Sequence, residues 1–441
     1  MNRRFFCILF FAELPALGLS IMTDTLLKQR ALHYHEYPTP GKLGVYVTKP
    51  TNSQDDLSLA YTPGVAEPVL EIVKNPEDAY RYTAKGNLIA IMTDGTAVLG
   101  LGNTGALASK PVMEGKAVLF KRFAGIDVFD IEIDAADPQS FIATAKSIAP
   151  TFGGINLEDI KAPECFEIEQ ALIEQLNIPV FHDDQHGTAI VVAAGLLNAL
   201  ELQNKKLEDI QIVCVGAGAA GIASMRLLVA LGADKDKMLL LDSEGVIHLE
   251  RENLNPYKFA FARKTDKRTL EDAMDGADVF IGVARPNLLD ASLLKLMAPR
   301  PIVFALSNPT PEILPHLALE VRQDLIIATG RSDYPNQVNN VLCFPYIFRG
   351  ALDVRASCIN EAMQIAAVEA IRQLVHKPVP QEVKDNYPQV TDWTFGPNYI
   401  LPKPIDPRLL EQVPAQVAKA AIASGVNRIM AEHQSHVTGD V

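Results

Sequence analysis

Two pairs of acidic residues, each directly after a short β-rich run, are the first candidates for chemistry in this sequence. Glu158 and Asp159 follow Gly-Gly-Ile-Asn-Leu, and Asp183 and Asp184 lie in the segment Phe-His-Asp-Asp-Gln-His-Gly-Thr. Ligands of α/β proteins bind where strands end, and three carboxylates from two neighbouring strand ends would suit Mg²⁺ or Mn²⁺. Taken singly, each pair is more typical of an N-cap that complements a helix dipole. Spacing alone leaves both interpretations open.

Two histidines, His182 and His186, flank the second acidic pair with the spacing H-x-x-x-H. A zinc protease places a glutamate after the first histidine, whereas this chain has Asp183, and no helical period surrounds the pair. We therefore interpret these histidines as residues of the turn or as supports of its acidic side chains.

A glycine-rich segment between an expected strand (210–215) and an expected helix (222–231) is the second candidate. Its three glycines follow the dinucleotide-binding pattern: a tight turn, close approach of the backbone to a pyrophosphate, and close packing of helix on strand. An acidic residue ends the next strand, 21 residues after the last glycine, and would hold the ribose hydroxyls. The predicted cofactor-binding residues are Gly216, Gly218, Ala219, Ala220, Gly221 and Asp242.

The residues after this second strand favour NAD over NADP. Glu244 adds a carboxylate beside Asp242, where the 2′-phosphate of NADP would lie, and like charges oppose binding. Arg251 and Lys258 are close in sequence and would favour NADP if their side chains folded inward. NAD is the expected cofactor, with NADP as the alternative.

The elements that position these residues alternate between β-rich runs and amphipathic segments, a pattern typical of α/β architecture. In an N-terminal α/β catalytic lobe we expect strands at 88–92, 128–133, 154–157 and 179–182 and helices at 114–123 and 163–176. A long apolar helix at 188–202 leads into a Rossmann-like NAD-binding lobe with a parallel sheet. Its expected strands are 210–215, 238–241, 279–283, 302–306 and 325–328.

Beyond residue 350 the pattern turns helical, at 351–375 and 413–430, and we expect these C-terminal helices to fold back across both lobes. The proline-rich connector 378–407 is expected to be an extended surface excursion. The predicted domains are a catalytic domain at 22–184, a Rossmann domain at 185–400 and a helical segment at 401–441.

The composition is that of a soluble globular protein, with 441 residues, 48% hydrophobic and 21% charged, and a net charge of −13. This acidic balance disfavours nucleic acid and anionic membrane surfaces as partners. Five scattered cysteines without a C-x-x-C pair favour a reducing, cytoplasmic setting over a disulfide framework or a zinc site.

Residues 1–21 superficially follow the layout of a signal peptide, since two arginines precede the apolar run 5–12. The run is too short to span a bilayer, and Glu13 interrupts it. Met22 opens a polar stretch that looks like a natural start. We therefore expect 1–21 to be a non-native or poorly ordered extension.

Tyr61 and Lys116 would pass, on spacing alone, for a turn tyrosine and a surface lysine. The strings around them and around the acidic pairs, however, resemble those of the malic enzymes, specifically their short bacterial branch. These strings are DLSLAYTPGVA, TDGTAVLGLGN, KPVMEGK, LED, HDDQHGT, LSNPT and VNN. They occur in order between Thr48 and Asn340, and FGPNYILPKP follows from Phe395, so the resemblance covers most of the chain.

The resemblance implies an NAD(P)-dependent malic enzyme, which decarboxylates (S)-malate oxidatively to pyruvate and CO₂ with a divalent metal. By position it implies Lys116 as the base that takes the proton of the C2 hydroxyl, Tyr61 as the acid that protonates C3, and Asp183 as the acidic neighbour of the metal ligands. A lysine serves as this base only if burial and a nearby Mg²⁺ or Mn²⁺ depress its pKa.

The remaining implied residues bind the metal and the small molecules. The metal ligands by position are Glu158, Asp159 and Asp184. Asn308 and Asn340 match asparagines that contact malate and nicotinamide. The resemblance also suggests a homodimer in which one subunit lends its tyrosine to the other's site.

Two departures from the family pattern limit the resemblance. The larger eukaryotic-type members carry an arginine for a malate carboxylate where this chain has Ala97, so the anchor of the distal carboxylate stays open. The chain also ends at Val441, and we do not expect the phosphotransacetylase-like extension of hybrid enzymes.

Two other functions fit parts of the pattern. A metal-free amino-acid dehydrogenase also pairs a substrate lobe with a Rossmann lobe and uses a lysine, but it leaves the two acidic pairs without a role. A nucleotide-binding regulatory protein with a decayed site is disfavoured by the intact tyrosine, lysine and carboxylates. A single assay of NAD reduction with malate and Mn²⁺ separates the three.

Overall fold

The computed structural model describes residues 16–430, and the chain divides into two units, Met1–Tyr46 and Val47–Val441. The first unit contains the helix α1 (Ala16–Glu36), which begins before Met22. Residues 1–15 of the predicted extension, with Cys7, lie outside the described residues. Of the helices in the described range, none combines the length and the apolar character that a membrane crossing requires.

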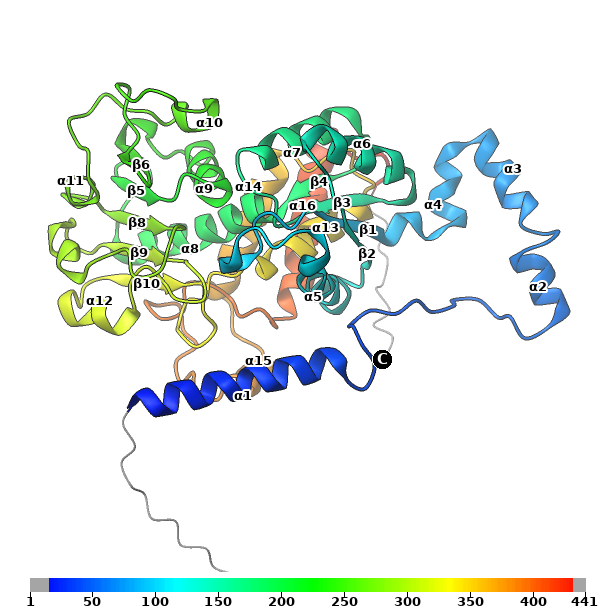
Figure 1. Cartoon of the computed structure of the whole chain (residues 1–441), viewed down its shortest axis with the longest axis horizontal. Helices are drawn as coiled ribbons and strands as arrows, with labels where there is room; N and C mark the ends of the chain where they lie inside the picture. Colours follow the sequence, from blue (N-terminus) through cyan, green and yellow to red (C-terminus); the bar gives the residue numbers. More distant parts are fainter. Residues whose placement is uncertain (1–15, 431–441) are drawn as a thin grey trace, which may run out of the picture. The chain divides into compact units, whose positions relative to one another are not determined.

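The first sheet of the second unit has four parallel strands in the order β2-β1-β3-β4 (Figure 1). These strands are β1 (Leu88–Thr93), β2 (Asp127–Glu132), β3 (Gly154–Leu157) and β4 (Val180–His182). All residues of β1, β3 and β4 are buried, and such strands appear in a sequence as continuous apolar runs. All four strands were predicted. The helices of this lobe are α5 (Ala106–Ala124), α6 (Pro138–Ile148) and α7 (Glu164–Gln175).

The second sheet has six strands in the order β10-β9-β8-β5-β6-β7, and it confirms the Rossmann-like lobe. Its strands are β5 (Ile212–Val215), β6 (Met238–Asp242), β7 (Gly245–Val246), β8 (Val279–Gly282), β9 (Ile302–Ala305) and β10 (Ile326–Thr329). Five of them are parallel and were predicted; β7 is antiparallel to β6 and too short to show an alternating pattern. The helices here are α9 (Ala219–Ala230), α10 (Pro256–Phe259), α11 (Leu270–Met274) and α12 (Pro315–Val321).

The apolar helix α8 (Thr188–Gln203) follows the first sheet as predicted, and four C-terminal helices follow the second sheet. They are α13 (Phe344–Asp353), α14 (Glu361–Gln373), α15 (Gln381–Asn386) and α16 (Arg408–Ala423). The rings of Phe344 and Phe348 lie 4.7 and 5.5 Å from that of Phe120 in α5. Asn198 of α8 donates to the carbonyl of Arg372 in α14.

Two predictions about this region were wrong. The expected helix 351–375 is interrupted: Arg355 has a left-handed φ of 46°, and Asn360 caps a new helix by accepting the amide of Met363. The connector 378–407 is not simply an extended surface excursion, because it contains α15 and buries the apolar residues Tyr399, Ile400 and Leu401.

The segment before the first sheet consists of short helices without buried residues. It contains α2 (Gln54–Ala60), α3 (Ala66–Lys74) and α4 (Ala79–Tyr82), and these helices bury none of their residues in the described chain. Tyr61 lies at the end of α2.

Candidate active site

The two acidic pairs meet at one edge of the first sheet. β3 and β4 are neighbouring parallel strands with Leu157 opposite His182, so the acids that follow both strands emerge side by side. Glu158, Asp159 and Asp184 each present a carboxylate oxygen within 4.8 Å of the others. The backbone amide of Asp159 donates to Asp184 Oδ2 at 2.7 Å. Hard oxygen ligands gathered in this way fit Mg²⁺ or Mn²⁺.

Lys116 reaches this cluster from α5 and is not a surface residue. Its Nζ lies 2.6 Å from Asp183 Oδ2 and 2.9 Å from Glu158 Oε1, and its side chain is 9% exposed. The ammonium also lies 4.3 Å from the centre of the Phe344 ring. The structure thus brings together Lys116 and all four acidic residues that the sequence singled out.

The electrostatics of Lys116 differ from the expected depressed pKa. Burial alone would lower the pKa of the lysine, but the carboxylates of Asp183 and Glu158 outweigh this effect and raise it above its usual value. Burial in turn raises the pKa of Glu158 and of Asp183 against the pull of Lys116. The carboxylates of the chain itself therefore favour the charged form of this lysine.

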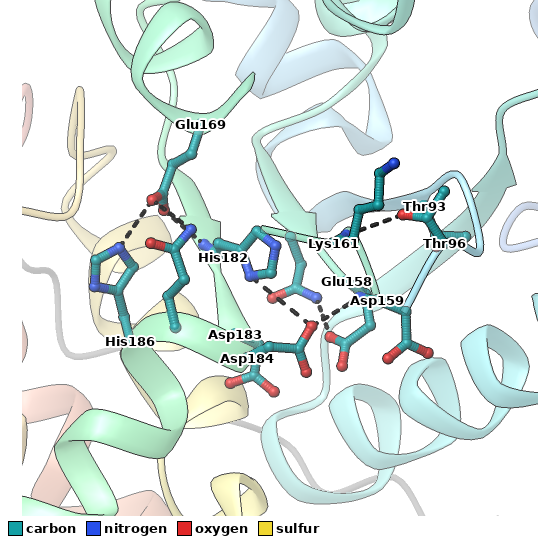
Figure 2. A network of polar contacts seen from close by, with 12 residues as sticks. Thr93, Thr96, Glu158, Asp159, Lys161, Glu169, His182, Asp183, Asp184 and His186 are labelled. Carbon is teal, nitrogen blue, oxygen red and sulfur yellow. Dashed lines mark hydrogen bonds and ion pairs between the residues drawn. The ribbon is translucent and has the colours of Figure 1, made fainter. Parts of the chain in front are cut away.

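A second layer of contacts supports the acidic turn, and Figure 2 shows it around His182. Glu169 of α7 accepts the backbone amide of His182 and the side-chain amide of Gln185. His186 Nε2 lies 3.0 Å from the same carboxylate. The two histidines are thus turn residues, as predicted, but Glu169 was missed, although a glutamate on the buried face of an amphipathic helix was the signal for it.

Tyr61 is not part of this cluster in the described chain. Its side chain is 75% exposed, whereas Lys116 is buried. The hydrogen bonds of Tyr61 are backbone bonds to Leu57 and Val65. The segment that carries it contributes nothing to the core.

Asn308 and Asn340 lie on loops of the second lobe that approach the first. A Cβ atom placed on Gly100, in the first lobe, would lie 2.8 Å from the carbonyl oxygen of Asn308. A Cβ on Gly187, next to Asp183, would lie 3.2 Å from Asn340 Cβ. Asn340 is therefore beside the acidic turn, and Asn308 lies where the two lobes meet.

The glycine-rich turn has the geometry of a pyrophosphate site. Gly216 has a φ of 116°, and a Cβ on it would lie 2.5 Å from the carbonyl oxygen of Val283. A Cβ on Gly221 would lie 1.9 Å from the carbonyl oxygen of Gly216, so the start of α9 packs directly on the turn. A Cβ on Gly218 would meet nothing within 4 Å, which leaves open space at the N-terminus of α9, as an NAD(P) pyrophosphate requires.

Asp242 has charged partners that the sequence only raised as a possibility. Arg251 donates to both of its oxygens, at 2.8 and 3.1 Å, and Lys258 Nζ donates at 2.7 Å. Burial would raise the pKa of Asp242, but these hydrogen bonds lower it to about 2. Glu244 is also 3.1 Å from Arg251. The two carboxylates are therefore neutralised by two inward-folded cations.

Comparison with known proteins gives the same result for both lobes. The family model for the malic enzyme N-terminal domain matches residues 40–173, and that for the malic enzyme NAD binding domain matches residues 185–394. The NADP-dependent malic enzyme of Halomonas elongata is 63% identical over 92% of this chain and 96% of its own length. That of Escherichia coli is 60% identical over 91% of this chain, which spans only 53% of the relative.

Solved structures are similar over nearly the whole chain. The malic enzyme from Pyrococcus horikoshii has a TM-score of 0.84 and 44% identity, covering 91% of this chain and 92% of its own. The NAD-dependent malic enzyme of Thermotoga maritima has a TM-score of 0.77 and 41% identity, covering 93% and 99%. With both lobes matched and the carboxylates gathered around a buried lysine, this chain belongs to the malic enzyme family, the NAD(P)-dependent oxidoreductases that its motifs predicted.

Proposed function

We propose that this chain converts (S)-malate and NAD(P)⁺ to pyruvate, CO₂ and NAD(P)H. The observation that carries the proposal is the position of Lys116, buried between Asp183 and Glu158 at the edge of a three-carboxylate cluster. A buried lysine in contact with two carboxylates is expensive to maintain for stability alone. It is therefore a candidate for proton transfer.

Glu158, Asp159 and Asp184 would hold a Mg²⁺ or Mn²⁺ ion. When bound, the ion supplies Lewis acidity at the C1 carboxylate and C2 oxygen of malate, and its charge lowers the pKa of a neighbouring lysine. The carboxylate oxygens of these residues, within 4.8 Å of one another, fit such an ion. The open space over Gly218 fits the pyrophosphate of the cofactor that accepts the hydride.

The side chains of this protein then divide the proton chemistry. Lys116 accepts the proton of the C2 hydroxyl while hydride leaves C2 for the nicotinamide. Asp183, at 2.6 Å, orients the lysine and offsets its charge. After the C3–C4 bond breaks and CO₂ departs, the electron pair left at C3 takes a proton from Tyr61. Asn308 and Asn340 orient malate and nicotinamide from the second lobe.

For Tyr61, we propose that the site is completed between two copies of the chain. The support is the exposure of the segment around it: Leu59 is 68% exposed and Val73 is 74% exposed, in helices that bury no residue. Exposed apolar side chains on consecutive helices are typical of an interface with a partner. A homodimer in which this segment docks on the other subunit would bury them and bring Tyr61 to its partner's site.

For the cofactor, we propose that the chain accepts NADP as well as NAD. The predicted preference for NAD assumed that Asp242 and Glu244 would repel a 2′-phosphate. Their ion pairs with Arg251 and Lys258 offset this repulsion. A 2′-phosphate would replace a carboxylate as the partner of these cations.

The domain limits 22–184, 185–400 and 401–441 and a cytoplasmic location remain proposals. The division near residue 185 is supported by the sequential order of the two sheets. The location is supported by three buried free thiols, Cys165, Cys214 and Cys343, which suit a reducing compartment.

The deciding experiment is an absorbance assay of NAD(P)H formation with (S)-malate and Mn²⁺, combined with detection of pyruvate. We expect activity that disappears after exhaustive EDTA treatment and returns with Mn²⁺ or Mg²⁺. Full activity after EDTA treatment would contradict the metal assignment and favour a metal-free dehydrogenase. Absence of malate-dependent turnover with both cofactors would contradict the proposed reaction.

A further inference from the structure

We propose that Glu169 is a positioning residue for the metal site: it fixes the turn that carries Asp183 and Asp184. The inference rests on the proposed function, since it takes Asp184 as a metal ligand. Figure 2 shows that Glu169 points toward His182 and His186, apart from the three-carboxylate cluster, and it contacts none of the cluster's oxygens in the described structure. Its effect must therefore pass through the turn.

The carboxylate of Glu169 is occupied entirely by this one turn. Oε1 accepts the backbone amide of His182 at 2.8 Å, immediately before the acidic pair. Oε2 lies 3.1 Å from Gln185 Nε2 and 3.0 Å from His186 Nε2, immediately after the pair. Glu169 thus binds the chain on both sides of Asp183 and Asp184.

The burial of Glu169 strengthens these hydrogen bonds. The residue is 6% exposed and Gln185 is 2% exposed, so water does not compete for their hydrogen bonds. A carboxylate removed from water is tolerated when hydrogen bonds satisfy it, and among residues 16–430 the hydrogen-bond partners of Glu169 lie between positions 182 and 186. The other acidic side chains of α7 are not buried.

The turn that carries Asp183 and Asp184 has an unusual, closely packed conformation. Residues Asp183–Gly187 form a single wide helical turn of the π type, and such turns are uncommon and concentrate at functional sites. A Cβ on Gly187 would lie 1.8 Å from Asp183 Oδ1, so the chain folds closely over that side chain. On its other side the turn reaches Asp159 and Lys116 through Asp184 and Asp183.

The consequence is that one carboxylate sets the positions of two others. If the hydrogen bonds of Glu169 to His182 and Gln185 are lost, Asp184 is no longer held against the amide of Asp159. The distances between the three metal ligands then increase. Loss of such outer supports typically reduces metal affinity by about 10- to 100-fold. The hydrogen bonds of Glu169 do not reach the glycine-rich turn of the second lobe, although α9, which begins at that turn, packs against the acidic turn.

The test is a Mn²⁺ titration of the full chain, without malate, followed by electron paramagnetic resonance of the free ion. Glu169→Gln keeps the volume of the side chain but removes its charge and one acceptor. Glu174→Gln is the matched control, because it makes the same change at an exposed position of the same helix. Asp184→Asn serves as the reference for a lost ligand. Far-UV circular dichroism and NADPH fluorescence report the fold and the second lobe.

For Glu169→Gln we expect a Mn²⁺ Kd raised by about tenfold or more, with NADPH affinity within about twofold of the unaltered chain. We also expect its kcat to recover in part at saturating Mn²⁺, which a residue with a purely structural role would not show. A Kd equal to that of Glu174→Gln in a folded protein would overturn the inference.

If Glu169→Gln does not fold, Gln185→Leu removes one of the three contacts at similar volume and decides the question. A Mn²⁺ Kd raised by severalfold supports the inference, and an unchanged Kd overturns it. Failure of the unaltered chain to bind Mn²⁺ would overturn the metal site of the proposed function, and the inference with it. Mn²⁺ binding that Asp184→Asn weakens and Glu169→Gln leaves unchanged overturns the inference alone.

Discussion

The two residues assigned to proton transfer lie in opposite surroundings. Lys116 is 9% exposed and has two carboxylates within 3 Å, while Tyr61 is 75% exposed on helices that bury nothing. Burial fixes a side chain, because close packing and hydrogen bonds leave it few alternatives. Under the proposed function, a single chain organises the step at Lys116, and a second copy of the chain completes the step at Tyr61.

The difference follows from where each residue lies in the sequence. Lys116 belongs to a helix whose other inward residues, among them Met113, Ala117 and Phe120, form part of the main core. Tyr61 follows Leu57 and Leu59, which are apolar but exposed. Apolar residues without a core of their own chain are the expected signature of an interface.

The largest effect is expected for a substitution of the buried Lys116. Lys116→Ala should reduce kcat for malate oxidation by about 10²- to 10⁴-fold, because the base for the C2 hydroxyl is lost. Binding of NADPH should persist, since the glycine-rich turn lies on the other lobe. Stopped-flow measurement of hydride transfer reports the step directly, and partial rescue by small amines would identify the missing group. Normal oxidation by the variant would contradict the assignment of Lys116.

The exposed half is tested by Tyr61→Phe, which keeps the ring and removes the proton donor. We expect a loss of about 10²-fold in turnover, with binding of malate, metal and cofactor retained. Exchange of solvent tritium into the methyl group of pyruvate should fall by a similar factor. Exchange at the normal rate would make Tyr61 a packing residue.

Mixed dimers of Tyr61→Phe with Lys116→Ala, isolated through two different affinity tags, show whether Tyr61 acts in its own chain or in its partner's site. If each subunit lends its tyrosine, one of the two sites has both residues intact, and about half of the unaltered activity should return. If Tyr61 serves its own chain, no site is intact and activity stays at the level of the single variants. The recovered activity therefore distinguishes the two arrangements.

Asp184→Asn tests the ligand cluster that the buried lysine adjoins. Replacing a carboxylate by an amide removes charge from a hard-cation site, and the Mn²⁺ requirement should rise by about 10- to 100-fold. Titration of activity against free Mn²⁺ measures this shift, and NADPH fluorescence should change little. An unchanged Mn²⁺ requirement would remove Asp184 from the ligand set.

The sequence predicts most of the fold because most strands of both sheets are buried and parallel, and such strands appear as short apolar runs. It also predicts the acidic cluster, since Glu158 and Asp184 follow neighbouring strands. The break between α13 and α14 was missed because the apolar period continues across it, although Asn360 is a good N-cap residue. Glu169 was missed because its role depends on a contact between α7 and the turn after β4, whereas the pattern of α7 marks it only as a glutamate on the buried face.

The sequence also leaves the charge balance of the cofactor end undecided. Asp242 and Glu244 looked alike as carboxylates, but the side chain of Asp242 is 7% exposed and that of Glu244 is 76% exposed. Which of them meets the ribose depends on Arg251 and Lys258, and those side chains could fold either way.

The smallest effect is expected at the cofactor site, where the side chain of Asp242 is buried and that of Glu244 is exposed. Glu244→Lys removes one acid from Arg251 and adds a cation, so the ratio of kcat/KM for NADP to that for NAD should rise by about threefold to tenfold. The change is modest because solvent screens a charge at this exposed position. Lys258→Ala should shift the ratio the other way, since it removes an amine, now paired with Asp242 at 2.7 Å, that a 2′-phosphate would take as its partner. Steady-state kinetics with both cofactors give all three ratios. An unchanged ratio in Glu244→Lys with a lowered one in Lys258→Ala would place the pocket at Asp242 and leave Glu244 outside it, whereas no change in either variant would contradict a 2′-phosphate site at these cations.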